Sequence, residues 1–269
     1  MICIYKSTIF QWELLHLLRQ KINRLLNSQP SGVVYLSSWL TENGFSTQLL
    51  NRYKKSNWLY SIGTGAWMRV GEEPTYEGAI YALQKQSQLG VHIGGKTALS
   101  LLGKAHYLEL STQQIILCGG SKEKLPAWFT KYDWGVKVSY FSTSFLPSKA
   151  GLQTLEQSNF GLQISNPVRA LLECLYMAPK KQKLVECYEI MEGLNNLRPK
   201  QVQELLEQCT SIKVKRLFLY MAEKSNHNWF KYIDAEKIDT GKGKRSLVKN
   251  GVYIAEYGIT VPKELAEYE

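Results

Sequence analysis

The chain has 269 residues and a mass of 30.8 kDa, a length that suits one large domain or two to three small ones. Apolar residues make up 44% of it and charged residues 21%, which excludes a disordered tail, a collagen and a low-complexity scaffold. Lys and Arg outnumber Asp and Glu by 33 to 23, and this net charge of +10 favours an anionic partner such as nucleic acid, an acidic protein surface or a lipid surface.

The apolar runs are far shorter than the roughly 20 residues that a membrane helix needs, and the N-terminus lacks the features of a secretory signal. We therefore expect a cytoplasmic protein with no membrane partner. The five cysteines are scattered without a C-x-x-C pair, and no two histidines have the spacing of metal ligands. The sequence thus predicts buried, reduced thiols, no metal site and no cofactor.

The first seventy residues predict three helices followed by a β-hairpin. Apolar residues recur with a helical period over residues 10–26 and, more briefly, over 35–41. After a tight turn, Ser46 suits the N-cap of a third helix over 47–55. Two aromatic-rich runs around a Gly-x-Gly turn, within residues 58–70, then predict a β-ribbon. This order of elements is typical of a winged helix-turn-helix.

The third predicted helix has one polar face that suits the major groove of DNA, because Asn and Gln can pair with adenine through two hydrogen bonds and Arg can pair with guanine in the same way. A merely solvated face of a small α+β bundle is the alternative explanation of the same pattern. Base contacts are predicted from Gln48, Asn51 and Arg52, and phosphate contacts from Thr47, Lys54, Lys55 and the ribbon residue Arg69.

The remainder of the chain predicts a mixed region followed by helices, so the fold class is α+β. Acidic residues and a proline at 72–74 mark a boundary, which gives a winged helix-turn-helix over residues 1–74, a mixed α/β region over 75–164 and a helical C-terminal region over 165–269 that continues from it. The expected helices cover 76–89, 167 onward, 181–191, 199–208 and 212–223, and the expected strands cover 115–117, 136–141 and 259–261.

The C-terminal region carries a second concentration of positive charge. Between Ser211 and Lys249 there are ten cations and four acids. At its centre, the glycines of the segment GKGKR at 241–245 let the backbone approach a phosphate or an acidic groove. A solvated surface loop is the alternative. The residues predicted to contact a partner or phosphate are Lys242, Lys244 and Arg245.

One segment, GVHIGGKT at 90–97, fits the G-x-x-x-x-G-K-[ST] pattern of phosphate-binding P-loops. A working P-loop follows a buried strand, whereas here the polar end of a predicted helix precedes it, and no later strand ends in an Asp suited to hold Mg²⁺. No other catalytic motif is present in the sequence. We therefore expect no enzyme, and we keep a nucleotide-binding enzyme that uses Lys96 and Thr97 as an alternative hypothesis.

Together with the predicted winged helix, several short segments resemble, in their order along the chain, the AbiE-type antitoxins of bacterial abortive-infection, type IV toxin–antitoxin systems. They are HIGGKTAL at 92–99, ISNPVRALLE at 164–173, KRLFL at 215–219, GKR at 243–245 and ITVP at 259–262.

The resemblance implies a bifunctional protein for phage defence. Its winged helix would repress its own operon by binding inverted repeats in double-stranded promoter DNA, and its C-terminal region would counter a nucleotidyltransferase toxin encoded alongside. The resemblance also implies that the P-loop look-alike at 90–97 is a turn common to the family and that it binds no nucleotide. Repressors of palindromic sites often bind as pairs, so self-association on DNA is expected. A protein-interaction module that does not bind DNA, and that docks an acidic partner through residues 241–245, is the remaining alternative.

Overall fold

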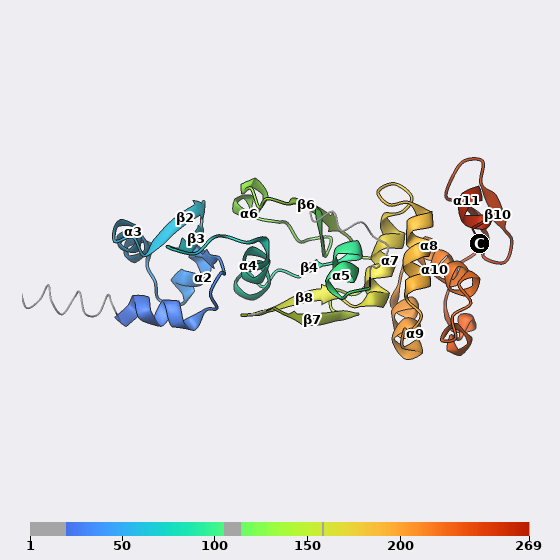
Figure 1. Ribbon diagram of the computed structural model, residues 1–269, viewed down its shortest axis with the longest axis horizontal. Coiled ribbons are helices and arrows are strands. Elements are labelled where there is room, and N and C mark those ends of the chain that lie inside the picture. The colour runs from blue at the N-terminus through green and yellow to red at the C-terminus, as the bar shows by residue number, and fades with distance from the viewer. Residues whose placement is uncertain (1–19, 105–113, 158, 269) are drawn as a thin grey trace, which may run out of the picture. The chain divides into compact units, whose positions relative to one another are not determined.

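The computed structural model of the chain describes residues 20–104, 114–157 and 159–268 (Figure 1). It confirms the predicted mixed α+β class. The described residues form two compact units. The first unit holds the chain up to Leu89 together with Leu125–Trp134 and Glu156–Leu162, and the second unit holds the rest. Within the described ranges, no helix has the length and apolar character needed to cross a membrane.

The first unit begins with helices around a small antiparallel sheet. A helix whose described part covers residues 20–28 leads into β1 (Tyr35–Leu36), α2 (Ser37–Glu42), α3 (Thr47–Lys55), β2 (Leu59–Gly63) and β3 (Ala66–Arg69). The strands pair in the order β1-β3-β2. The second predicted helix starts two residues late because Tyr35 and Leu36 pair with Trp67 and Ala66 of β3. Residues 10–19 of the first predicted helix lie outside the described residues.

The predicted ribbon is the β2–β3 hairpin, whose two-residue turn is Thr64 and Gly65. Gly65 has a φ of +82°, a backbone conformation that side chains other than glycine rarely adopt. Between the hairpin, α2 and α3 lies one buried apolar cluster, so the three elements share a core. Its buried members are Ile22, Leu25, Tyr35, Leu40, Phe45, Leu49, Leu50, Tyr53 and Leu59.

The predicted helix over 76–89 changes geometry partway along. It is α4 (Tyr76–Tyr81) followed directly by a π-helical turn (Ala82–Gln86). The buried amide of Gln86 accepts a hydrogen bond from the backbone N–H of Leu36 at 2.8 Å and donates one to the carbonyl of Val34 at 2.7 Å. The side chain thereby satisfies backbone groups at the start of β1, which binds this turn to the small sheet. A short helix, α6 (Ala127–Lys131), packs on β2.

The second unit is built on a five-stranded sheet with the order β6-β5-β4-β8-β7. Its strands are β4 (His92–Ile93), β5 (Gln114–Gly119), β6 (Lys137–Ser142), β7 (Leu152–Glu156) and β8 (Gly161–Ser165). β5 runs parallel to β6 and antiparallel to β4. α5 (Gly95–Leu101) follows β4 directly. The sequence predicted β5 and β6 but missed β4, β7 and β8.

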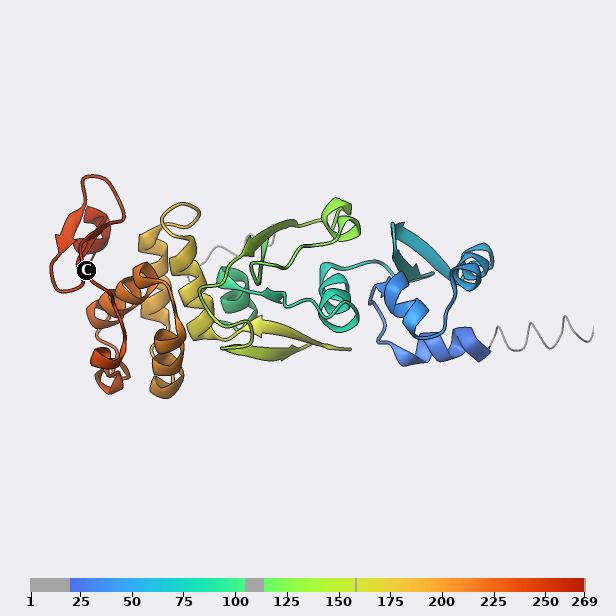
Figure 2. The same cartoon turned by 180° about the vertical axis from the view of Figure 1, so that it is seen from behind.

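Helices follow the sheet, as Figure 2 shows from behind. They are α7 (Pro167–Met177), α8 (Leu184–Gly193), α9 (Pro199–Gln208) and α10 (Ile212–Lys224), and α7, α8 and α10 pack on one another. Two 3₁₀ turns (Phe230–Tyr232 and Ala235–Lys237) lead to a small sheet of β9 (Arg245–Ser246), β10 (Val252–Ile254) and β11 (Ile259–Val261), and then to α11 (Lys263–Ala266). The four described cysteines are buried and free, as predicted.

Candidate nucleic-acid interface

The polar face of α3 is exposed to solvent. The Ser46 side chain caps the helix by accepting a hydrogen bond from the backbone N–H of Leu49 at 3.3 Å. Leu49, Leu50 and Tyr53 are buried in the core. The opposite face is exposed to solvent along its whole length, so an external ligand can reach it. The residues of this exposed face are Gln48, Asn51, Arg52 and Lys55.

The charge of α3 is entirely positive. The helix carries no acidic residue, and its last turn holds Arg52, Lys54 and Lys55. Cations are favourable there because the carboxyl end of a helix has a partial negative charge. Thr47 and Lys54 are also exposed, and because they are seven residues apart they lie on the same side of this polar face. Six of the seven residues predicted to contact DNA therefore lie together on one small helix surface.

Arg69, the seventh predicted DNA contact, is placed differently. Its Nη2 donates to the Leu26 carbonyl at 2.7 Å and to the Tyr35 hydroxyl at 3.0 Å, and its Nη1 forms an ion pair with Glu72 at 3.0 Å. The guanidinium therefore connects the hairpin to the first helix and to β1. Glu72, three residues after Arg69, was the sequence signal for this internal role, because it supplies the opposite charge.

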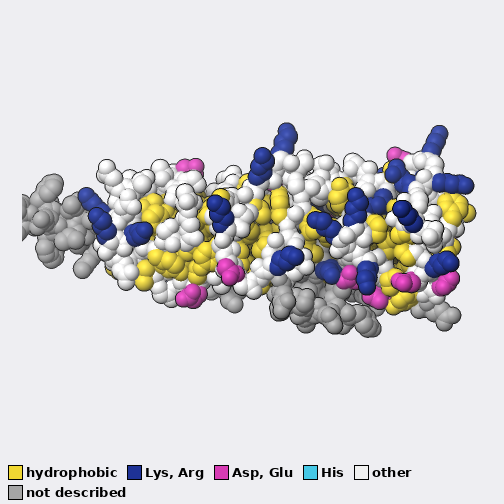
Figure 3. Space-filling view, turned by 90° about the horizontal axis from the view of Figure 1, so that it is seen from above, with side chains coloured by type: hydrophobic (Ala, Val, Ile, Leu, Met, Phe, Trp, Pro, Cys, Tyr) yellow, Lys and Arg dark blue, Asp and Glu magenta, His cyan; other side chains and the backbone are white. Residues whose placement is uncertain are grey.

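The basic loop at 241–245 has a defined shape because a buried arginine holds its backbone. From α10, Arg216 donates hydrogen bonds to the carbonyls of Thr240 at 2.7 Å, Gly241 at 3.0 Å, Gly243 at 2.7 Å and Gly258 at 3.1 Å. The cationic side chains of the loop are all exposed, and Lys244 lies 5.0 Å from the ring of Tyr253. Figure 3 shows Lys and Arg side chains on the C-terminal part of the molecule, at the right of the view.

In the P-loop look-alike, the groups of residues 95–97 form hydrogen bonds and an ion pair with other residues of the chain. The backbone N–H of Gly95 donates to a carboxylate oxygen of Glu173 at 2.9 Å. The Lys96 ammonium lies 2.6 Å from Glu186, and the Thr97 hydroxyl accepts a hydrogen bond from the Ile116 N–H at 3.0 Å. In a P-loop these three groups would face phosphates and Mg²⁺. Their internal partners, together with a preceding strand of only two residues, argue against nucleotide binding at this segment.

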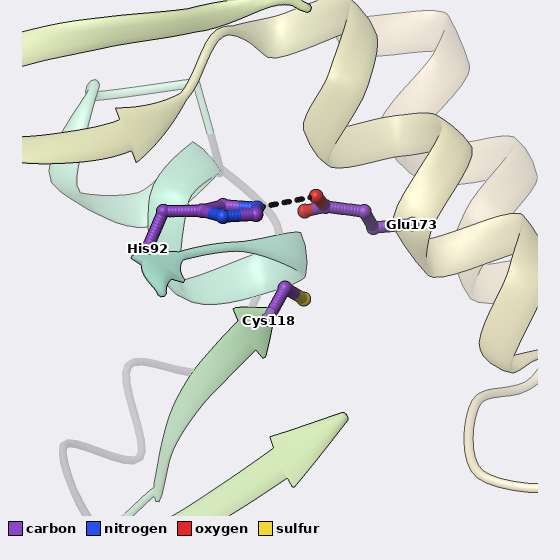
Figure 4. Close-up of side chains that lie close together, drawn as sticks. All are labelled: His92, Cys118 and Glu173. Atoms are coloured by element: carbon purple, nitrogen blue, oxygen red, sulfur yellow. Dashed lines mark hydrogen bonds and ion pairs between the residues drawn. The ribbon is translucent and has the colours of Figure 1, made fainter. Parts of the chain in front are cut away.

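Glu173 lies at the centre of a buried cluster (Figure 4). Its carboxylate accepts hydrogen bonds from the Nε2 of His92 at 2.8 Å, the Ser165 hydroxyl at 2.8 Å, the Arg169 Nε at 2.9 Å and the Gly95 N–H. Burial by itself raises the pKa of this carboxyl, but the interactions with His92 and Arg169 outweigh burial and lower the pKa to about 2. Glu173 is therefore ionised, and four donors surround its charge.

His92, Cys118 and Glu173 bring three ligand-type atoms within 4.8 Å of one another. No local pattern indicates this grouping, because the residues come from β4, β5 and α7. The arrangement suits a hydrogen-bonded carboxylate better than a metal ion. The Arg169 guanidinium already neutralises Glu173, and burial raises the pKa of the Cys118 thiol, so this side chain stays protonated.

Comparison with known proteins identifies the class to which the chain belongs. A family model described as "Transcriptional regulator, AbiEi antitoxin, Type IV TA system" matches residues 112–262, and one for the AbiEi antitoxin N-terminal domain matches residues 18–110. The protein is thus a regulator of the type IV toxin–antitoxin class. Within that class, the chain belongs to the AbiEi antitoxin family, which confirms the resemblance seen in the sequence.

The fold also has a solved counterpart. The crystal structure of the RV2827C protein from Mycobacterium tuberculosis is similar with a TM-score of 0.53, over 85% of this chain and 86% of that chain, at 12% sequence identity. At that identity the likeness concerns the fold alone. No curated protein matches the chain significantly.

Proposed function

We propose that this chain is an autoregulatory repressor of its own operon as well as an antitoxin. In this proposal the elements from the first helix to β3 form a winged helix-turn-helix, with α3 as the recognition helix and the β2–β3 hairpin as the wing. The observation that carries the proposal is the exposed, acid-free polar face of α3, backed by a buried core.

The proposed contacts follow from the exposure of each side chain. Gln48, Asn51 and Arg52 read base edges in the major groove, while Thr47, Lys54 and Lys55 bind phosphates. Arg69 is left out because its guanidinium is bonded inside the first unit. Two copies bind the two halves of an inverted repeat in the promoter, in the cytoplasm where that DNA resides.

Arg52→Ala is expected to weaken binding to the operator by about 1–3 kcal/mol, because it removes a base contact, and to leave binding to unrelated DNA nearly unchanged. Lys55→Ala is expected to weaken binding to all DNA sequences alike. It should also reduce the slope of log affinity against log salt concentration by about one, the contribution of one phosphate contact. Gel-shift titrations with the chain's own promoter, at two salt concentrations, measure both effects. Lys85→Ala, an exposed cation of the same unit outside α3, is the matched control. Unchanged operator affinity in both α3 variants would contradict the proposal.

The antitoxin half of the proposal concerns the basic loop. Its cations Lys242, Lys244 and Arg245 are exposed on a backbone that Arg216 fixes, which gives a partner a defined surface of positive charge. We assign this surface to contact with the nucleotidyltransferase toxin or with phosphate, and through that contact the C-terminal region counters the toxin. The loop and α3 are separate surfaces in this proposal, so substitutions can test them one at a time.

Replacing Lys242, Lys244 and Arg245 together by Ala is expected to abolish rescue of growth when the chain is co-expressed with the neighbouring toxin, while operator binding is kept. Arg52→Ala is expected to keep the rescue of growth and to weaken operator binding, provided that both genes are transcribed from inducible promoters. Lys200→Ala, which removes a highly exposed cation of α9, controls for lost charge. Full rescue by the triple variant would remove the loop from the antitoxin function.

A further inference from the structure

A cavity of about 260 Å³ opens in the second unit, where β5 and β6 end. Because these two strands are parallel, their carboxyl ends meet at one edge of the sheet, the place where α/β sheets usually bind ligands. The volume is slightly below that of sites for drug-sized molecules, so the cavity suits a small metabolite. Its walls combine backbone from a glycine turn, hydroxyl groups, cations and one carboxylate. These lining residues include Gly119, Gly120, Ser144, Lys122, Glu123 and Arg169.

Two buried polar side chains, Arg169 and His92, line this cavity. Arg169 is 4% exposed; its Nε bonds Glu173, and its Nη1 donates to the carbonyls of Pro147, Ser148 and Ala150. His92 is 1% exposed and also lines the cavity, and its Nδ1 is buried without a partner in the described part of the chain. Buried polar atoms normally have partners, so Nδ1 of His92 points to a ligand.

The groups that line the cavity indicate the chemistry of that ligand. Glu173 is ionised and can only accept hydrogen bonds, so His92 donates to it from Nε2, and Nδ1 is the ring nitrogen left for a ligand. An oxyanion in the cavity would lie against the planar guanidinium of Arg169, which favours negatively charged oxygens. The ammonium of Lys122 adds positive charge at the rim. By contrast, Glu123 would repel an oxyanion and instead accepts hydrogen bonds from hydroxyl groups.

We propose that this cavity is a binding site for a phosphate monoester of a small hydroxylated molecule. The phosphate lies against His92, Arg169 and Lys122, and the hydroxyl groups of the organic part face Glu123 and the serine side chains. This site is independent of the proposed DNA and toxin surfaces, since none of its residues belongs to α3 or to the basic loop. It also differs from the P-loop look-alike, whose Gly95, Lys96 and Thr97 have internal partners.

The test uses the full chain and ribose 5-phosphate as the probe, with inorganic phosphate and ribose as comparisons. Isothermal titration calorimetry is expected to give saturable binding of ribose 5-phosphate with a Kd of about 1 mM or tighter, and at least tenfold weaker binding of ribose and of inorganic phosphate. ¹⁵N NMR is expected to show that the Nδ1 resonance of His92 shifts when the probe binds.

Two variants decide the assignment. His92→Gln keeps an amide donor near the position of Nε2, toward Glu173, but removes Nδ1; Lys122→Ala removes an exposed cation of the cavity rim and leaves the core intact. Each is expected to weaken the binding of ribose 5-phosphate at least tenfold, whereas Lys149→Ala, an exposed neighbour outside the lining, leaves it unchanged. The proposal is overturned if the wild-type chain shows no saturable binding, if inorganic phosphate binds as tightly as the ester, or if Lys122→Ala binds like the wild type.

Discussion

Glu173→Ala is expected to lower the free energy of unfolding of the second unit by about 3–5 kcal/mol, the usual effect of removing one partner of a buried ion pair. The Arg169 guanidinium would remain buried without its counter-charge. His92, Ser165 and the Gly95 N–H would each lose the acceptor of a hydrogen bond. These groups come from β4, α5, β8 and α7, so the carboxylate joins two parts of the chain that are far apart in sequence.

Urea denaturation followed by circular dichroism measures this loss. The transition of the second unit has to be fitted separately if the two units unfold in two steps. Glu186→Ala is the matched control, because the Lys96–Glu186 pair is partly exposed, and such pairs contribute at most about 1 kcal/mol. If the two variants were equally stable, Glu173 would not be the centre of the core that the hydrogen bonds suggest.

The low pKa of Glu173 adds a pH signature to the same prediction. The carboxyl titrates at about 2 in the folded chain, compared with an ordinary value of 4.5. Because folding lowers the pKa, the stabilisation is fully present above pH 4.5 and is lost as the pH falls from there toward 2. Glu173→Gln removes the titrating group, so its stability should change less with pH than that of the wild type over this interval.

Arg216→Ala is expected to lower the free energy of unfolding by about 2–4 kcal/mol and to release the basic loop. The guanidinium makes charge-assisted hydrogen bonds to four carbonyls, each stronger than a neutral one, but the loop is exposed, so water can replace part of them. Arg245→Ala is the control, because this side chain is exposed and its removal leaves those four bonds in place.

Hydrogen exchange and thermal denaturation distinguish the two effects of Arg216→Ala. Faster exchange at the amides of residues 240–246, together with a lower Tm, is the expected result. The variant should also rescue growth less well against the toxin than Arg245→Ala does, since it disturbs the backbone that carries all three cations of the loop. A variant with wild-type exchange in this loop would show that the backbone holds its shape without the arginine.

The sequence predicted best those elements whose signals are local. α9 has the predicted bounds, and α10 extends one residue beyond them, because amphipathic periodicity and a proline or serine at the start are properties of neighbouring residues. The same holds for α3, where the Ser46 cap and the alternation of buried and exposed positions were visible in nine residues. Arg169 and Glu173 likewise have the i,i+4 spacing of an ion pair on one helix face.

What could not be predicted depends on contacts between distant segments. The spacing of Arg169 and Glu173 does not show that both side chains are buried. Nor does it show that His92 and Gly95, which lie 81 and 78 residues from Glu173 along the chain, complete the cluster. β4 has only two residues and carries no periodicity. Arg69 is predicted to contact phosphate from its place in the ribbon, and nothing in the sequence indicated its hydrogen bonds to Leu26 and Tyr35, which are far away along the chain.

The first unit is discontinuous in sequence, and this has a consequence for how the protein folds. Trp128 and Phe129 of α6 are buried in the unit, and a side chain at Gly63 of β2 would come within 3.0 Å of Trp128. The ring of Phe160 lies 5.1 Å from that of Tyr81. A nascent chain that has emerged only as far as Leu89 therefore lacks part of its own hydrophobic interior. The first unit completes its packing only after translation has passed residue 160.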